Sequence, residues 1–115
     1  MTYKNQLRRL NVRQLRTRRT RLARQLPNVE ATLRGALQRQ MRRCGKADCR
    51  CAAGELHGPY LYLSVRTGAR SGLLYVPAEV VEAVKRRVET TGRIEAALAE
   101  ISVINLELFA RGKLD

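Results

Sequence analysis

The sequence predicts a small α+β protein in which a coiled-coil-like helical hairpin is combined with a zinc-stapled loop and a β-hairpin. Three observations support this fold class: a basic amphipathic pattern at the start of the chain, a window that holds every cysteine and the one histidine, and two alternating segments followed by a long apolar seam. The expected hairpin has two N-terminal helices and one long C-terminal helix. At 115 residues, the chain is expected to form a single domain, 1–115.

Residues 4–26 carry apolar side chains at helical spacing, which predicts an amphipathic helix. The apolar side is formed by Val12, Leu15, Leu22 and Leu26. The opposite side is formed by Arg9, Arg13, Arg16 and Arg24. Because like charges three and four residues apart repel one another, this helix needs a packing partner, a polyanion or both.

A second helix is predicted over residues 29–43, after Pro27 interrupts the first pattern and Asn28 provides a cap. Its expected inward positions are Val29, Leu33, Ala36, Leu37 and Met41. The spacing nearly keeps a heptad across the proline, so one kinked rod is an alternative. Together the two segments form the predicted basic N-terminal helices, 1–43.

The window 44–58 is interpreted as a zinc loop. Its candidate ligands are Cys44, Cys49, Cys51 and His57, in the spacing Cys-x4-Cys-x-Cys-x5-His. Three thiolates and one imidazole form the ligand set of a closed structural zinc site. The chain shows no secretory signal pattern, so we expect a cytoplasmic protein with reduced cysteines.

Several alternatives to this ligand set stay open. Only two of the three thiols ligate in one alternative, and water or another protein group completes the shell. A redox or iron–sulfur role is a second, and unrelated buried or surface thiols are a third. We expect no enzyme activity and no catalytic residue; if His57 does not ligate, a catalytic zinc with Glu55 as base returns as an alternative.

A β-hairpin is predicted over residues 59–76, because residues 60–66 and 73–76 alternate and are rich in strand formers, and a loop with two glycines joins them. Tyr60 and Tyr62 fall on the same face as Ser64 and Arg66, whereas the intervening leucines face the other way. Tyrosines beside arginines can stack on nucleic-acid bases, although they can equally serve to cover a small hairpin.

The last predicted element is a long helix over residues 77–111, opened by Pro77 and ended by Gly112 at the C′ position. Its apolar seam consists of Val81, Val84, Val88, Ile94, Leu98, Ile101, Asn105 and Leu108. Because this seam exceeds what the hairpin can cover, we expect it to pack on the N-terminal helices or on another chain.

The positive charge of the chain is concentrated in its first half. Residues 1–50 hold 15 basic and two acidic side chains, whereas residues 51–115 hold eight of each, and the total is +13. Such a one-sided basic surface indicates a polyanionic partner, DNA or RNA. The candidate contacts are Arg9, Arg13, Arg16, Arg24, Arg39, Arg42, Arg43, Lys46, Arg50, Tyr60, Tyr62, Arg66 and Arg70. A merely solvated helix face is the alternative, but such faces normally mix charge signs.

The run Arg43-Cys-Gly-Lys-x-x-Cys-Arg-Cys51 and the later His57-Gly-Pro-Tyr-x-Tyr-Leu63 resemble the signature of a family of small uncharacterised prokaryotic proteins. The resemblance covers residues 30–110, and it implies a hairpin followed by a long helix. Members often occur near transposase-like genes, which implies an accessory role in a mobile element.

From these features we expect a zinc-stabilised accessory protein that binds DNA or RNA mainly through phosphates. The alternative is a zinc-stapled coiled-coil scaffold that forms a homodimer or docks onto another protein. No apolar run approaches the length of a membrane span, so no membrane partner is expected.

Overall fold

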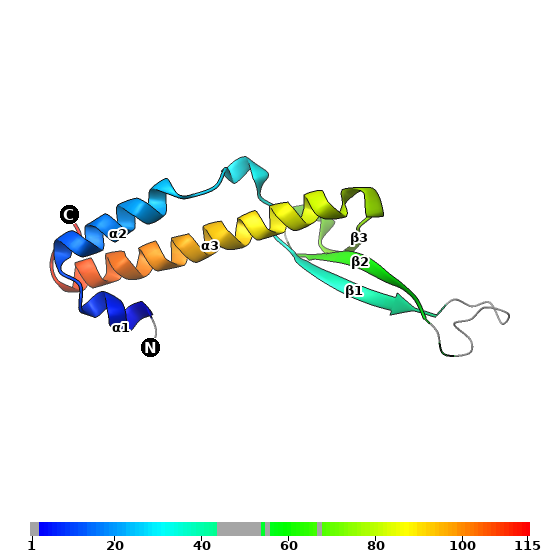
Figure 1. Cartoon of the computed structure of the whole chain (residues 1–115), viewed down its shortest axis with the longest axis horizontal. Helices are drawn as coiled ribbons and strands as arrows, with labels where there is room; N and C mark the ends of the chain where they lie inside the picture. The colour runs from blue at the N-terminus through cyan, green and yellow to red at the C-terminus, as the bar shows by residue number, and fades with distance from the viewer. Residues whose placement is uncertain (1–2, 44–53, 55, 67) are drawn as a thin grey trace. The chain divides into compact units, whose positions relative to one another are not determined.

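The computed structural model describes residues 3–43, 54, 56–66 and 68–115, and it has a mixed α+β fold (Figure 1). Its helices are α1 (Tyr3–Arg8), α2 (Val12–Arg24) and α3 (Val81–Ala110), with 3-10 turns η1 (Val29–Ala31), η3 (Gly68–Arg70) and η4 (Ala78–Val80). Its strands are β1 (Ala36–Arg42), β2 (His57–Val65) and β3 (Gly72–Tyr75). The chain, expected to be one domain, groups into two compact units. Unit 1 is Met1–Ala31 with Thr90–Asp115, and unit 2 is Thr32–Glu89.

The N-terminal segment forms two helices, not the single helix predicted over residues 4–26. The break is caused by a capping box at Asn11, whose side chain accepts a 2.8 Å hydrogen bond from the main-chain N–H of Gln14. The Gln14 side chain accepts one of 2.9 Å from the N–H of Asn11 in return. This reciprocal pair satisfies two N–H groups at the start of α2 and so favours a new helix there.

In unit 1, α2 lies alongside the C-terminal part of α3 (Figure 1). The core consists of Leu7, Leu15, Ile104 and Leu108, all fully buried. Half-buried apolar side chains pack around it, among them Val12 and Leu22. Three of the four predicted inward positions of the first segment are therefore confirmed. Leu26 is exposed because α2 ends at Arg24, two residues before it.

The second predicted N-terminal helix, over residues 29–43, is wrong. Only the 3-10 turn η1 forms at its start, and residues 36–42 are strand β1, which pairs antiparallel with β2. The segment is rich in Ala, Leu, Gln, Arg and Met, all good helix formers, so its local propensity is overridden by pairing with β2. The predicted inward positions Val29 and Met41 are accordingly exposed.

Unit 2 is built on a three-stranded antiparallel sheet with the order β1-β2-β3. The predicted hairpin is confirmed as β2 and β3, in which Tyr62 pairs with Tyr75 and Leu63 with Leu74. Leu63, Val65 and Val76 form its core. The apolar side chains packed against this core are Leu33, Leu37, Leu61, Val81, Val84 and Val88.

The chain comes very close to this core at Gly35, just before β1. A Cβ atom built there lies 2.8 Å from Leu63 Cδ1 and 2.9 Å from the carbonyl oxygen of Ser64. Because these distances are far inside van der Waals contact, only glycine allows the chain to enter β1 against β2 at this point.

The long C-terminal helix is confirmed, with Pro77 before the turn η4 and α3 ending at Ala110. Gly112 adopts a φ of 70°, and its N–H donates to the carbonyl of Phe109 while that of Lys113 donates to the carbonyl of Leu108. This is the αL termination expected of glycine at C′. Across the described residues, no helix combines the length and the apolar character that crossing a bilayer requires.

Candidate functional site

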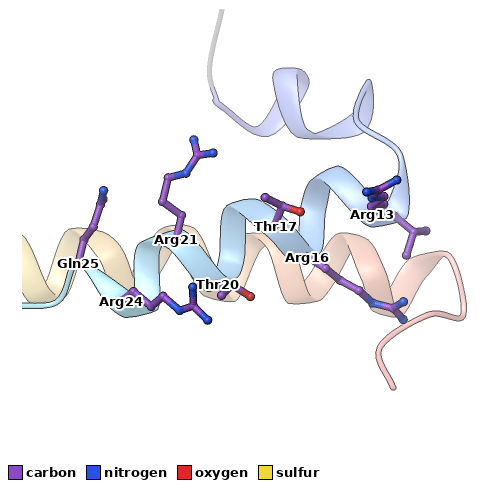
Figure 2. A pocket seen from close by; sticks show the side chains of 8 residues that line it. Arg13, Arg16, Thr17, Thr20, Arg21, Arg24 and Gln25 are labelled. Carbon is purple, nitrogen blue, oxygen red and sulfur yellow. The ribbon is translucent and has the colours of Figure 1, made fainter.

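The first candidate surface is on α2, a helix that contains six arginines and no acidic residue. A shallow depression of about 770 Å³ runs along it (Figure 2). It is lined by Val12, Arg13, Arg16, Thr17, Thr20, Arg21, Arg24 and Gln25. Because these residues all come from α2 and its C-cap Gln25, the depression is open to solvent on the surface of unit 1 rather than an enclosed cavity.

Two of the arginines on α2 are used for packing within unit 1. Arg18 donates to Glu100 Oε1 through Nη2 at 2.5 Å and through Nε at 2.8 Å. Arg19 donates to the side-chain oxygen of Asn105 at 2.8 Å. Both are half-buried at the edge of the core, so their charge is directed toward α3 and not outward.

The remaining arginines of α2 face solvent. Arg16 donates a 3.1 Å hydrogen bond to the carbonyl of Lys113, which ties its head group to the C-terminal segment. Arg13, Arg21 and Arg24 are exposed and form no ion pair or hydrogen bond with any residue in the described part of the chain. We call these three the arginine strip, since they leave a guanidinium charge uncompensated on the surface. Arg9 lies outside it, exposed in the turn between α1 and α2.

The second candidate surface is the face of the sheet turned away from the apolar core of unit 2, which we call the open sheet face. Residues paired across antiparallel strands share a face, and alternate residues of a strand do as well. The register therefore places on this face Ala36, Gln38, Gln40, Tyr60, Tyr62, Ser64, Leu73 and Tyr75. The predicted common face of Tyr60, Tyr62 and Ser64 agrees with this register.

An aromatic and cationic cluster lies at the centre of the open sheet face. The rings of Tyr62 and Tyr75 meet edge to face, with centroids 5.7 Å apart at an interplanar angle of 64°. The guanidinium carbon of Arg42 lies 4.8 Å from the centroid of the Tyr62 ring, within the range of a cation–π interaction. Tyr62 is only 7% exposed, whereas Tyr75 is 55% exposed.

A depression of about 660 Å³ covers this cluster. It is lined by Arg42, Arg43, His57, Tyr60, Tyr62, Leu73 and Tyr75. A second depression of about 420 Å³ is lined by Arg34, Gly35, Ala36, Gln38, Ser64 and Arg66. Within the described strands, no residue is Asp or Glu, so the face is neutral to basic throughout.

The other predicted contacts are dispersed. Arg39 pairs with Leu61, and it therefore falls on the opposite face of the sheet from the tyrosines. Arg70 is exposed in η3. Lys46 and Arg50 lie outside the described residues. Tyr75 was not among the contacts predicted from the sequence. Its spacing from Leu73 puts both on one face of β3, and its pairing with Tyr62 identifies this as the open sheet face.

Of the four proposed zinc ligands, only His57 lies in the described part of the chain; Cys44, Cys49 and Cys51 fall outside it. His57 is half-buried at the start of β2, and its register partner is Arg42, which is two residues before Cys44 in the sequence. The pairing thus joins the two ends of the segment that holds the cysteines. The residues described include no group of three or more metal-ligating side chains.

The backbone next to His57, at the start of β2, adopts a conformation that requires glycine at position 58. Gly58 has a φ of 127°, and a Cβ atom built on it lies 2.9 Å from the carbonyl oxygen of Gln40. At this level the register between β1 and β2 shifts between Gln40 and Arg42, which is a bulge-like irregularity. A side chain at position 58 would separate the strands where His57 and Arg42 are held together.

Comparison with known proteins gives one result. A family model described as a domain of unknown function (DUF6788) matches residues 12–86, which include α2, the whole sheet and the start of α3. No match was found among curated proteins or among solved structures.

Proposed function

The chain belongs to the DUF6788 family, and we propose that it is a nucleic-acid-binding accessory protein that contacts DNA or RNA mainly through phosphates. The observation that carries this proposal is the arginine strip. Arg13, Arg21 and Arg24 project from a helix without acidic residues and have no partner among the described residues. Unpaired guanidinium groups in a row match the spaced negative charges of a nucleic-acid backbone.

The partition of the arginines supports a binding role over a solvated helix face. Arg18 is neutralised by Glu100, and Arg19 is directed to Asn105. If the basic composition of α2 served only stability, acidic partners would be expected for the outer arginines as well, because repulsion between like charges destabilises a helix. Thr17 and Thr20, which line the same strip, add hydroxyl groups able to donate to phosphate oxygens.

We further propose that zinc fixes the segment between β1 and β2, with Cys44, Cys49, Cys51 and His57 as ligands. The pairing of His57 with Arg42 supports this, since it brings the two ends of the segment together before any metal is considered. Zinc bound in this way would have a structural role and would position Arg42, Arg43, Lys46 and Arg50 toward a polyanion. The resemblance to proteins encoded near transposase-like genes supports a setting in a mobile-element nucleoprotein complex.

The test is the binding of zinc-loaded protein to labelled duplex DNA, single-stranded DNA and RNA over a salt series. Log affinity is expected to fall linearly with log salt, with a slope of about 0.9 per duplex phosphate contacted. The triple variant Arg13→Gln, Arg21→Gln, Arg24→Gln is expected to lower the affinity. It is also expected to reduce the salt slope by an amount that corresponds to about two to three phosphate contacts.

A matched control separates loss of the strip from loss of charge in general. Lys85, Arg86 and Arg93 are exposed residues of α3 that are not among the candidate contacts, so the triple variant K85Q/R86Q/R93Q removes the same charge from another element. This control is expected to keep most of the salt slope. Equal effects of the two triple variants, or no binding by the wild-type chain, would refute the role of the strip.

The alternative function is a scaffold that dimerises or docks onto another protein through α3. It is favoured by three apolar side chains on α3 that remain exposed: Leu98 at 60%, Leu106 at 64% and Phe109 at 66%. Of the seam residues predicted for this role, Val84 instead packs on the sheet of unit 2. Leu98→Asp with Leu106→Asp is therefore the informative variant, and a scaffold predicts that it lowers the mass of the assembly in light scattering.

A further inference from the structure

The open sheet face has a composition that differs from that of an ordinary solvent-exposed sheet. Its opposite face is covered by the apolar start of α3, including Val81, Val84 and Val88. The open sheet face consists of three tyrosines, two glutamines, a serine, Ala36 and Leu73, and Arg42 lies against the ring of Tyr62. An aromatic surface with basic and amide side chains and no carboxylate is suited to bases and phosphates.

We propose that the open sheet face is a binding platform for single-stranded nucleic acid, on which bases stack on Tyr75 and Tyr60. This inference rests on the proposed function, and it assigns the class of nucleic acid that unit 2 recognises. A duplex keeps its base faces stacked on one another, so only unpaired bases offer a face to a tyrosine ring.

The tyrosines divide into a support and two platforms. Tyr62 is almost fully buried: Arg42 lies over its ring, and Tyr75 packs against it edge to face. It holds its neighbours in place and has little surface to offer. Tyr75 is more than half exposed and Tyr60 is half-buried, so these two rings are the ones that a base can reach.

The register places Tyr60 and Tyr75 close to one another on the open sheet face. Tyr75 is directly opposite Tyr62, and Tyr60 is two residues along β2, so Tyr60 and Tyr75 are diagonal neighbours. Such neighbours are about 7–8 Å apart. This spacing joins backbone positions and is within reach of long aromatic side chains, so one base or two successive bases can contact both rings.

The polar side chains of this face match the other parts of a nucleotide. Gln38, Gln40 and Ser64 provide amide and hydroxyl groups for base edges and sugars. The depressions along the face are lined at one end by Arg42 and Arg43 and at the other by Arg34 and Arg66. A single-stranded nucleic acid that crosses the sheet from Arg42 and Arg43 to Arg34 and Arg66 therefore meets cationic side chains at both ends.

The experiment measures the affinity of the full chain for fluorescein-labelled dT12, rU12 and a 12-base-pair duplex by anisotropy. Tyr75→Leu and Tyr60→Leu remove a ring and keep an apolar side chain, whereas Tyr75→Phe keeps the ring. Each leucine variant is expected to bind the single strands about tenfold more weakly and the duplex with nearly unchanged affinity. Tyr75→Phe is expected to stay within about twofold of wild type.

A second readout detects stacking directly. The chain has four tyrosines and no tryptophan, so its emission comes from tyrosine alone. Binding of dT12 or rU12 is expected to quench this emission, and Tyr75→Phe is expected to remove part of the quenched signal while it keeps the affinity. Leu74→Ala, a change on the opposite face of β3, is the control for damage to the strand.

The outcomes separate this inference from the proposed function. Single-strand affinity that is unchanged in Tyr75→Leu and Tyr60→Leu, or duplex affinity that falls equally, would overturn the stacking platform. If the arginine-strip variant still weakens binding in that case, the proposed function stands without it. A chain that binds none of the three probes would overturn both. The comparison of dT12 with rU12 decides between DNA and RNA.

Discussion

The guanidinium of Arg111 donates a hydrogen bond to the main-chain carbonyl of Leu10, with a distance of 2.6 Å between Nη1 and the oxygen. Nη2 of the same side chain donates to the carbonyls of Leu7 and Arg8, and Nε donates to Glu107. One arginine beyond the end of α3 thereby satisfies three carbonyls at the end of α1. The turn that orients α2, and with it the arginine strip, depends on this side chain.

Arg111→Met is expected to lower the free energy of unfolding of unit 1 by about 1–3 kcal/mol, because the partly buried carbonyl of Leu10 loses its donor and Glu107 loses its ion-pair partner. Arg111→Lys is expected to recover only part of this loss, since an ammonium group lacks the planar fork that reaches several carbonyls at once. Thermal or urea unfolding followed by circular dichroism measures both. Identical stability of the methionine variant and the wild type would contradict this role.

Arg18 and Arg21 are predicted to respond differently to the same substitution. Arg21→Gln removes an unpaired surface charge, so it is expected to weaken nucleic-acid binding and leave stability within about 0.5 kcal/mol of wild type. Arg18→Gln breaks the ion pair with Glu100, so it is expected to cost up to about 1 kcal/mol of stability and to affect binding less. Parallel melting and salt-dependent binding curves compare the two, and a reversed order would contradict the assignment.

Leu15→Ala is expected to destabilise unit 1 by about 2–5 kcal/mol, because Leu15 is fully buried beside Ile104 and its truncation leaves a cavity. Leu98→Ala makes the same chemical change at an exposed position of α3 and is expected to cost less than about 0.5 kcal/mol. Urea denaturation gives both values. A large cost at Leu98 would indicate that another copy of the chain or another partner covers this position.

Cys49→Ser is expected to abolish stoichiometric zinc binding and to unfold residues 44–76, since metal binding and folding are coupled in small zinc sites. Metal analysis of the purified protein gives the stoichiometry. Hydrogen exchange is expected to accelerate in β2 and β3, whereas the amides of α2 serve as an internal control because unit 1 has its own core. Unchanged zinc content would contradict the assignment of Cys49 as a ligand.

Features that depend only on neighbouring residues can be predicted from the sequence. The period of its apolar side chains specified α2 and the inward positions Leu15 and Leu22, and alternation specified the shared face of Tyr60 and Tyr62. Gly112 ended α3 for a local steric reason. The capping box that separates α1 from α2 is equally local, because it depends only on Asn11 and Gln14, three residues apart.

Features that depend on residues distant in the chain arise only in the folded protein. Residues 36–42 have helix-forming side chains, yet they form β1 because β2 offers an edge to pair with and Gly35 allows the approach. Which arginines are neutralised depends on the position of Glu100, 82 residues after Arg18. Tyr75 joins the open sheet face through its pairing with Tyr62. Local propensity amounts to tenths of a kcal/mol per residue, so long-range pairing and burial override it wherever they compete.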